Sequence, residues 1–519
     1  MRISSTVRRA AQINGAGLAT DYLDRQRTWA QLDDRVARLA GGLRQLGVNA
    51  GDRVAMLSLN SDRYFEFFFA VPWAGAVAVP INTRLAPPEV VHWLTDSGST
   101  VLLVDDAFLA MLPKVLDQLP LITTLVYTGE NATPENMIAY EAMIQDHAPI
   151  EPMDQGGDEL AALFYTGGTT GRSKGVMLSH RNLLLNAIQF SGEMGFDLRS
   201  VYLHAAPMFH LANGAAMFAI ASAAGTSSII TAFEPVAVLE AIQNKRVNLG
   251  LLVPTMVNMV VNHPKAGDYD LSSLRDVLYG ASPMPEAVIE KAMEVLPNVD
   301  FHHAYGQTEA GPVLTIMPTE YHVTSGPLAG RLKSAGRAIL GVEVRIVDED
   351  DNEVERGVVG EICGRGENVM LGYWNQPEMT AETLRGGWLH TGDGGYMDDE
   401  GFIYVVDRVK DMIISGGENV YSAEVEDAVH QHDTIVECAV IGIPHEKWGE
   451  QVHAIVRCHD GRSVTEQALI DHCHEWIAGY KCPRSVEFVT DPLPLSGAGK
   501  ILKTELRQPY WAGKEKQVN

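Results

Sequence analysis

The chain has 519 residues, more than one hydrophobic core usually supports, so two or more domains are expected. Hydrophobic residues make up 46% and charged residues 20%, a composition typical of soluble globular proteins. Acidic residues outnumber basic ones by 66 to 40, and the formal net charge of −26 disfavours nucleic acids and anionic membranes as partners.

The first hundred residues alternate between helical and extended patterns. Thr28 and Gln31 have the spacing of a capping box, and the apolar residues that follow recur every three or four positions, which predicts one helix ending at Gly47. Strands are predicted at 54–59, 76–81 and 101–104, and helices at 62–70 and 88–95. This alternation predicts an α/β sheet covered by helices.

The pattern changes beyond about residue 410. Short strands are predicted at 439–443, 454–458 and 486–489, with helices that begin near Ser422 and Val464. We therefore predict an α/β protein with a large N-terminal domain of several subdomains (1–407) and a small mobile α+β domain (408–519). A short hinge near Lys410 would join them.

The five cysteines all lie in the last third of the chain, and none forms a C-x-x-C pair. An odd number in a long chain favours reduced thiols and a cytoplasmic location. The first residues lack the apolar core of a signal peptide, and no apolar run approaches the roughly 20 residues that span a bilayer. No integral membrane segment is expected. The oligomeric state stays open, with a homodimer among the alternatives.

A glycine- and threonine-rich segment, Y-T-G-G-T-T-G-R-S-K-G at 165–175, lies between strands predicted at 160–164 and 176–178. Glycines let the backbone approach an anion closely, while hydroxyls and a lysine add donors and positive charge. The pattern differs from the Walker loop, which opens a helix. Glycines alone would favour a flexible turn. The whole segment predicts phosphate binding by Thr166, Gly167, Gly168, Thr169, Thr170, Gly171 and Lys174.

This loop resembles the phosphate loop of the adenylate-forming superfamily, which contains acyl-CoA synthetases, peptide-synthetase adenylation domains and beetle luciferases. The usual pattern is Y-T-S-G-T-T-G-x-P-K-G, and here Gly167 and Ser173 replace the serine and the proline. Further segments resemble the motifs of that superfamily in its order. They are G-A-S-P at 280–283, Y-G-Q-T-E at 305–309, T-G-D at 391–393, D-R-V-K-D at 407–411 followed by S-G-G-E-N-V at 415–420, and L-S-G-A-G-K-I at 495–501.

The resemblance implies a site for ATP and Mg²⁺. A tyrosine ring would stack on adenine, a hydroxyl would contact phosphate, a carboxylate would hold Mg²⁺, and another would accept hydrogen bonds from the ribose. The residues implied are Tyr305 with Gly306 and the segment Gly280, Ala281, Ser282 and Pro283 for adenine, Thr308 for phosphate, Glu309 for Mg²⁺, and Asp393 with Arg408 for ribose.

The resemblance also implies two half-reactions at one site. Lys500 would reach the carboxylate and the α-phosphate during adenylation. The small domain would then rotate about Lys410 and present a loop that lines the pantetheine arm of coenzyme A. The residues implied for coenzyme A are Ser415, Gly416, Gly417 and Glu418.

The acyl pocket of the superfamily corresponds to the segment 204–214, which is rich in apolar and small residues. His210 would border the carboxylate end, although a packed histidine is nearly as good an interpretation. Overall, the chain looks most like medium- and long-chain fatty acyl-CoA ligases. We therefore expect an AMP-forming acid–thiol ligase acting on a fatty acid, ATP and coenzyme A.

Three other functions fit the sequence less well. Aryl-CoA ligases of the cinnamate or benzoate type are the next candidates, followed by an adenylation enzyme that charges a carrier protein. Peptide-synthetase adenylation domains usually carry aspartate where this chain has His210. A noncatalytic homologue is disfavoured because the charged residues of the motifs are retained: Lys174, Glu309, Asp393, Arg408 and Lys500.

Overall fold

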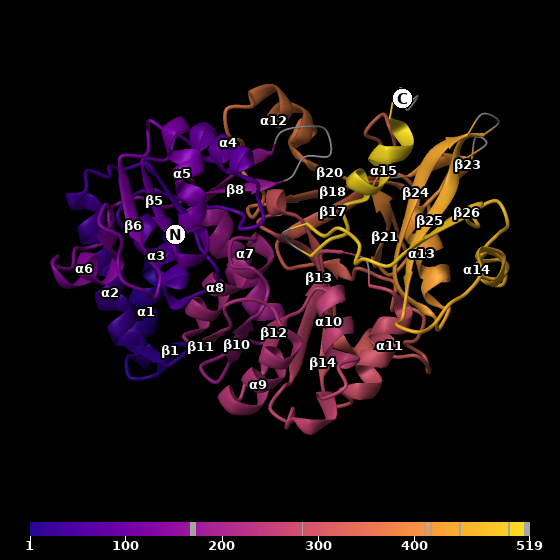
Figure 1. Cartoon of the computed structure of the whole chain (residues 1–519), viewed down its shortest axis with the longest axis horizontal. Helices are drawn as coiled ribbons and strands as arrows, with labels where there is room; N and C mark the ends of the chain where they lie inside the picture. The colour runs from indigo at the N-terminus through magenta and orange to yellow at the C-terminus, as the bar shows by residue number, and fades with distance from the viewer. Residues whose placement is uncertain are drawn as a thin grey trace.

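The computed structural model describes residues 1–166, 173–282, 284–408, 412–415, 418–445, 448–496 and 499–512, with the backbone alone at 407, 408, 414, 418 and 419. A large N-terminal part runs from indigo to orange in Figure 1, and a smaller C-terminal domain in orange and yellow lies beside it. This is the mixed α/β architecture expected from the sequence, with a large first domain and a small second one. No helix among these residues is both long and apolar enough to cross a membrane.

Two sheets organise the large domain. The first has eight strands, parallel in its middle and antiparallel where β9 joins β8 and β19. Its order is β19 (Gly372–Tyr373), β9 (Lys174–Ser179), β8 (Leu160–Thr166), β4 (Val77–Pro80), β3 (Arg53–Leu57), β5 (Val101–Val104), β6 (Thr124–Tyr127) and β7 (Ile138–Ala139).

The second sheet has nine strands and a parallel run from β1 to β14. Its order is β16 (Arg337–Ala338), β15 (Val313–Met317), β14 (Asp300–Gly306), β13 (Asp276–Gly280), β12 (Leu249–Leu251), β10 (Val201–His204), β11 (Thr226–Ile229), β1 (Leu18–Tyr22) and β2 (Arg25–Thr28).

Helices cover both sheets and fill the space between them. Every residue of α3 (Asp62–Trp73) is buried, because α3 contacts strands of both sheets. The other helices of this domain are α1 (Ser4–Asn14), α2 (Trp29–Gln45), α4 (Pro87–Ser97), α5 (Leu112–Val115), α6 (Tyr140–Gln145), α7 (His180–Glu193), α8 (Leu211–Ala223), α9 (Pro235–Lys245), α10 (Pro254–Val261), α11 (Glu286–Val295) and α12 (Pro377–Thr383).

The local predictions for this domain are confirmed. The Thr28 hydroxyl accepts a hydrogen bond from the backbone N–H of Gln31, and the Gln31 side chain accepts one from the N–H of Thr28, so α2 begins with a capping box. Gly47 has a φ of +86°, a conformation that favours glycine, directly after the end of α2.

A third sheet links the two domains, with order β17 (Val342–Val347), β18 (Gly360–Gly366), β20 (Leu389–Met397) and β21 (Ile403–Arg408). The C-terminal domain follows. It contains β22 (Ile413–Ser415), β23 (Glu418–Val420), α13 (Ser422–His430), β24 (Ile435–His445), β25 (Gly449–Cys458), α14 (Glu466–Cys473), β26 (Ser485–Val489) and α15 (Lys503–Trp511).

Two expectations for the C-terminal domain were wrong. β24 and β25 have 11 and 10 residues, because their antiparallel pairing continues beyond the predicted runs, from Ile435 opposite Cys458 to His445 opposite Gly449. The segment expected to be a loop at 415–420 contains the end of β22 and the whole of β23, which pair with each other.

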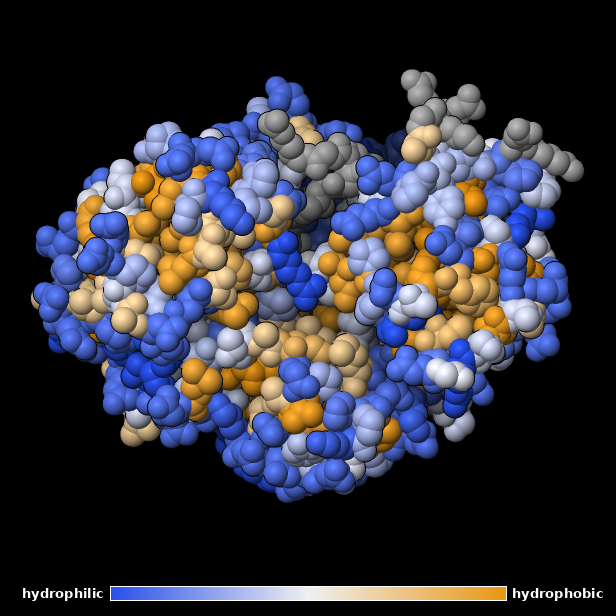
Figure 2. Space-filling model, in the orientation of Figure 1, coloured by the Kyte–Doolittle hydropathy of each residue, from blue (hydrophilic) through white to orange (hydrophobic). Residues whose placement is uncertain are grey.

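Apolar side chains gather on both sides of the hollow between the two domains in Figure 2, whereas the outer rim is mostly hydrophilic.

Candidate active site

The β8–β9 hairpin holds the two ends of the predicted phosphate loop together. Thr166, the last residue of β8, pairs in antiparallel register with Lys174, the first residue of β9. The loop between them lies outside the described residues, so its phosphate contacts stay predictions. The residues concerned are Gly167, Gly168, Thr169, Thr170 and Gly171.

Tyr373, which the motifs did not indicate, contacts both Lys174 and the predicted Mg²⁺ ligand Glu309. The Nζ of Lys174 lies 4.9 Å from the ring centroid of Tyr373, whose hydroxyl donates a hydrogen bond of 2.9 Å to Glu309 Oε1. Burial, followed by the charge of Glu309, raises the pKa of Tyr373 well above its usual range, so the phenol stays protonated.

The Glu309 carboxylate fits a hard cation. Glu309 is buried, and its Oε2 receives no hydrogen bond from the residues that the structure describes. A carboxylate oxygen left without a donor is the type of ligand that Mg²⁺ prefers. Thr308, also buried, precedes Glu309 in a short 3₁₀ turn.

The predicted adenine-binding segments meet at the ends of two neighbouring parallel strands. Gly280 ends β13 and lies opposite Ala304, next to Tyr305 in β14. A Cβ at Gly280 would lie 2.1 Å from the Ala304 carbonyl oxygen, so only glycine fits this approach. Ligands of open α/β sheets bind at such carboxyl ends of strands. Ala281 and Ser282 continue the loop, and Pro283 lies outside the described residues.

The tyrosine and the aspartate predicted for adenine and ribose are in contact. Tyr305 donates a hydrogen bond of 2.9 Å from its hydroxyl to Asp393 Oδ2. Asp393 lies in β20, directly opposite Arg408 in β21, whose side chain is not described. Gly306 follows Tyr305 where a Cβ would lie 1.9 Å from the Pro312 carbonyl oxygen, which again requires glycine.

A second cluster that the motifs did not indicate supports the T-G-D turn. Glu361 Oε1 accepts a hydrogen bond of 2.9 Å from the backbone N–H of Gly392, and its Oε2 lies 2.8 Å from His390 Nδ1. Cys363 Sγ lies 3.3 Å from the same nitrogen, which gives three groups that a metal could use. Burial, followed by the charge of Glu361, raises the pKa of the Cys363 thiol to about 12, so a hydrogen-bonded cluster explains the arrangement.

His210 and the loop of Lys500, which come from the two domains, both lie beside the acyl pocket. His210 caps α8, and its Nδ1 accepts a hydrogen bond of 3.2 Å from the Ala212 N–H. Burial, followed by the charge of Lys500, lowers the pKa of His210 to about 4, so the ring is neutral with its proton on Nε2. A Cβ on Gly499 would lie 3.2 Å from Val253 Cγ2, so the lysine loop packs against the pocket wall.

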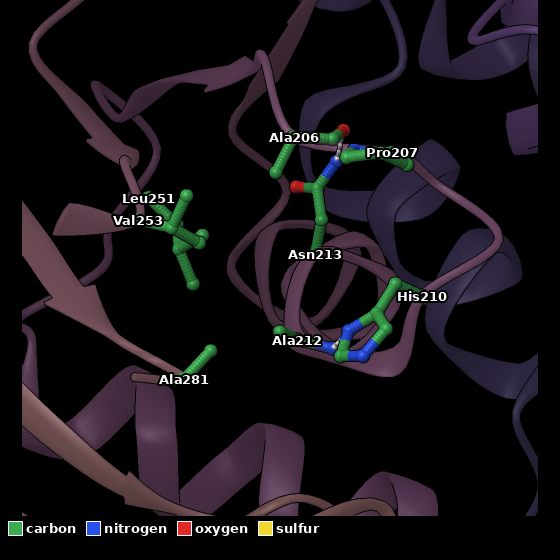
Figure 3. A pocket seen from close by; sticks show the side chains of 8 residues that line it. All are labelled: Ala206, Pro207, His210, Ala212, Asn213, Leu251, Val253 and Ala281. Carbon is green, nitrogen blue, oxygen red and sulfur yellow. Dashed lines mark hydrogen bonds between the residues drawn. The ribbon is translucent and has the colours of Figure 1, made fainter. Parts of the chain in front are cut away.

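The pocket itself is narrow and mostly apolar. It lies between the N-terminus of α8 and the ends of β10, β12 and β13 (Figure 3). The residues that line it are Ala206, Pro207, His210, Ala212, Asn213, Leu251, Val253 and Ala281. The chemistry of this lining favours an apolar group, with His210 and Asn213 as the polar residues that face it.

The predicted coenzyme A segment lies on β22 and β23. Ser415 is buried and pairs with Glu418 of β23 and Gly449 of β25. Gly416, Gly417 and the predicted pivot Lys410 lie outside the described residues, and the side chain of Glu418 is not described. Their roles therefore stay predictions.

The β8–β9 hairpin, the Tyr305–Asp393 pair and the Lys500 loop stand where the motifs of adenylate-forming acid–thiol ligases predict the phosphate, nucleoside and acyl sites. The chain matches the model of the AMP-binding enzyme family over residues 7–374 and that of the AMP-binding enzyme C-terminal domain over 424–500. It belongs to this family.

Similar proteins carry several substrate names. A feruloyl-CoA synthase of Amycolatopsis sp. is 40% identical over 93% of this chain and 94% of its own length. The fatty acid–[acyl-carrier-protein] ligase ScoC of Streptomyces coeruleorubidus is 36% identical over 95% and 93%. Among solved structures, the anthranilate CoA ligase AuaEII in complex with anthranoyl-AMP has a TM-score of 0.91 at 27% identity, covering 98% of this chain and 97% of that one.

Proposed function

We propose that this chain is an AMP-forming CoA ligase for an apolar carboxylic acid, with an aryl acid of hydroxycinnamate size as its first candidate. The observation that carries the proposal is that the Lys500 loop packs, at Gly499, against Val253 in the wall of an apolar pocket that His210 also lines. The Lys174–Tyr373–Glu309 cluster supplies the charges that ATP and Mg²⁺ need.

In the first half-reaction a carboxylate oxygen of the acid attacks the α-phosphorus of ATP. The bond from that phosphorus to the bridging oxygen breaks, and pyrophosphate leaves. Lys500 offsets the repulsion between two anions, and the neutral His210 offers its Nε2–H to the carboxylate. Mg²⁺, held by Glu309, would neutralise charge on the phosphates.

In the second half-reaction the thiol of coenzyme A attacks the acyl carbonyl, the thiol proton is lost, and AMP leaves as the acyl–phosphate bond breaks. The segment from Ser415 to Glu418 would line the path of the thiol.

We also propose domain limits of 1–407 and 408–519, because β21 ends at Arg408 and β22 begins at Ile413. Five unpaired cysteines support work in the reducing cytoplasm.

The aryl acid is preferred to the fatty acid on two grounds. The curated relative at 40% identity is named for a feruloyl group, against 36% for the fatty acid ligase. The lining also contains a polar residue, Asn213, whose amide is held by hydrogen bonds. A medium-chain fatty acid is the second candidate, and a carrier-protein thiol is the alternative acceptor, both favoured by the similarity to ScoC.

The test is a pyrophosphate-release assay with hydroxycinnamates, benzoates, fatty acids and short branched acids, with and without coenzyme A. We expect release with aryl acids and an acyl-CoA product by mass spectrometry. Release with fatty acids alone would support the second candidate. Release without any acyl-CoA would overturn coenzyme A as the acceptor, and no release with any acid would overturn the ligase.

The hinge has a separate test. Lys410→Pro should slow thioester formation from supplied acyl-AMP by about tenfold or more while adenylation changes little, since a rotation about this residue serves only the second step. A variant with both half-reactions intact would contradict the assignment of Lys410.

A further inference from the structure

A chain of hydrogen bonds runs from the acyl pocket into the core of the large domain. Asn213 donates from its amide nitrogen to the Ala206 carbonyl at 2.6 Å, and its Oδ1 lies 3.0 Å from His204 Nδ1. His204 Nε2 lies 3.1 Å from the hydroxyl of Ser227 on β11. Asn213, His204 and Ser227 are each 1% exposed or less, so the chain is built into the protein.

The donor and acceptor of every hydrogen bond in this series follow from one group whose role is fixed, the backbone carbonyl of Ala206. A backbone carbonyl only accepts, so the atom of Asn213 that faces Ala206 is the NH₂ group and the atom that faces His204 is the carbonyl oxygen. His204 therefore carries a proton on Nδ1 and donates it to Oδ1. Burial lowers the pKa of His204 to about 4, so Nε2 is unprotonated and accepts from Ser227.

The Asn213 oxygen keeps one acceptor site. An amide oxygen has two lone pairs, and His204 Nδ1 is its one hydrogen-bond donor in the described part of the chain. In Figure 3 this oxygen points from α8 toward the side of the pocket where Leu251 and Val253 lie. Apart from Asn213 and His210, the lining residues are apolar. The pocket thus offers a single oriented acceptor within an apolar wall.

We propose that Asn213 is a specificity-determining residue that accepts a hydrogen bond from a hydroxyl group on the acyl portion of the substrate, and that His204 is the residue that positions it. The proposal rests on the proposed function and narrows it to acids that carry a donor, such as hydroxyaryl acids. His204 acts by holding the amide so that it presents its oxygen to the pocket. Without this donor, the amide could turn and present another edge.

The energetic reason is that a buried amide oxygen loses free energy when one of its two acceptor sites, hydrated before the substrate binds, is left empty. A hydroxylated acid satisfies the second lone pair, whereas the same acid without the hydroxyl leaves it unpaired after water is displaced. Sites that hydrogen-bond a substrate hydroxyl reject the analogue that lacks it much more strongly than apolar pockets reject an extra methylene. The hydroxylated acid should therefore have the higher kcat/KM.

The experiment compares cinnamate with its 2-, 3- and 4-hydroxy derivatives in the adenylation half-reaction, using the full chain. For the wild type we expect at least one hydroxy isomer to exceed cinnamate in kcat/KM by about 10-fold or more. Asn213→Leu should bring this ratio to about 1. A ratio between two acids does not depend on the fraction of folded enzyme.

The positioning role has its own variants. His204→Leu removes the donor to Asn213 and should lower the ratio, whereas His204→Gln, with an amide N–H and an amide oxygen, should restore most of it. Ser227→Ala should lower the ratio less. Ser228→Ala is the matched control on the next residue of β11, since the buried Ser228 hydroxyl has no hydrogen-bond partner in the described residues, and it should leave the ratio unchanged.

Two outcomes would overturn the inference while the proposed function stands. One is a wild type that activates cinnamate and all its hydroxy isomers equally. The other is an Asn213→Leu variant that keeps the wild-type ratio. If His204→Leu and His204→Gln behave alike, the positioning role of His204 is overturned. Failure to activate cinnamate, its derivatives and decanoate would instead defeat the proposed function, and the inference with it.

Discussion

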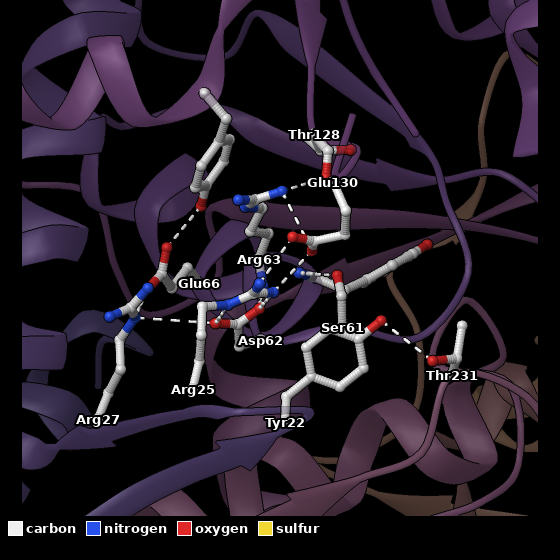
Figure 4. A network of polar contacts seen from close by, with 12 residues as sticks. Tyr22, Arg25, Arg27, Ser61, Asp62, Arg63, Glu66, Thr128, Glu130 and Thr231 are labelled. Atoms are coloured by element: carbon white, nitrogen blue, oxygen red, sulfur yellow. Dashed lines mark hydrogen bonds and ion pairs between the residues drawn. The ribbon is translucent and has the colours of Figure 1, made fainter. Parts of the chain in front are cut away.

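Two sets of buried charges in the large domain differ in how completely the protein compensates them. In the N-terminal part, α3 carries Asp62 and Glu66, both fully buried and surrounded by arginines (Figure 4). Arg25 donates to both oxygens of Asp62, at 2.9 and 2.8 Å. Arg35 donates to both oxygens of Glu66, at 2.5 and 3.1 Å, and Tyr140 adds a third bond at 2.8 Å.

At the candidate active site, Glu309 is also buried, although 8% exposed, and one of its oxygens receives no hydrogen bond from the described residues. In the described part of the chain, the partner of this carboxylate is the neutral phenol of Tyr373. A buried charge that the protein satisfies on every side holds elements together, whereas one that it satisfies halfway is prepared for a ligand. The degree of compensation thus separates structural from functional charges in this fold.

The largest expected effect comes from the lysine that the C-terminal domain adds to the site. Lys500→Ala should reduce acyl-AMP formation about 10³-fold, because a cation positioned at the reacting phosphate acts in a site shielded from water. Thioester formation from supplied acyl-AMP should be spared. Both half-reactions are measured by stopped-flow or quenched assays.

Lys291→Ala is the matched control, since it removes a lysine that pairs with Glu294 on the surface of α11. It should change neither step. An equal loss in both half-reactions for Lys500→Ala would remove its assignment to adenylation.

The converse experiment removes a structural charge. Glu66→Gln should lower the free energy of unfolding by about 3 kcal/mol, because Arg35 is left buried beside a neutral amide. Glu130→Gln, in the same network but with a side chain that is 45% exposed, should cost less than about 1 kcal/mol. Urea unfolding measures both, and activity per folded molecule should change little. Equal losses for the two variants would contradict the distinction between buried and exposed members.

Much of the fold could be predicted from local patterns. The capping box of α2 and the apolar strands around the phosphate loop depend on neighbours within a few residues, so periodicity and capping indicated them. The ordered motifs likewise indicated Tyr305 and Asp393, which the structure brings into hydrogen-bond contact although 88 positions separate them.

The contacts that complete the site could not be predicted in this way. Tyr373 lies 64 positions from Glu309, and Glu361 lies 31 positions from Gly392, so each role exists only after the sheets have formed. His204 lies within an apolar-looking strand, and its partners come from α8 and β11. Tertiary partners of single polar residues leave no periodic signal in a sequence.

A smaller effect sharpens the comparison at Glu309 itself. Glu309→Gln should lower kcat/KM for MgATP about 100-fold and raise the Mg²⁺ concentration needed for half-maximal rate, since an amide is a weaker ligand for a hard cation. Tyr373→Phe keeps the carboxylate and removes one hydrogen bond, and should cost less than about tenfold. The free energy of unfolding of both variants should lie within about 1 kcal/mol of that of the wild type. A Mg²⁺ dependence that Glu309→Gln leaves unchanged would assign the cation to other ligands.

The smallest expected effect is on the pH dependence of stability, and it comes from buried histidines. Unlike the buried carboxylates, these side chains are kept neutral by burial. His180 accepts a hydrogen bond from the Ile3 N–H at Nδ1, and burial lowers its pKa to about 4. Between about pH 6.5 and pH 4 the unfolded chain binds a proton at this residue that the folded chain does not, so stability falls as the pH falls through this window. Each such histidine contributes a slope of up to about 1.4 kcal/mol per pH unit.

His180→Asn keeps an acceptor near the Ile3 N–H and removes the titrating group. It should therefore reduce the slope of the unfolding free energy against pH in this window by the contribution of one histidine. Urea unfolding at half-unit steps of pH measures this slope. His263→Asn, at a half-buried position just after α10, is the matched control for the substitution itself. An undiminished slope for His180→Asn would mean that His180 is protonated in the folded protein, and burial alone would then not keep a histidine neutral at this depth.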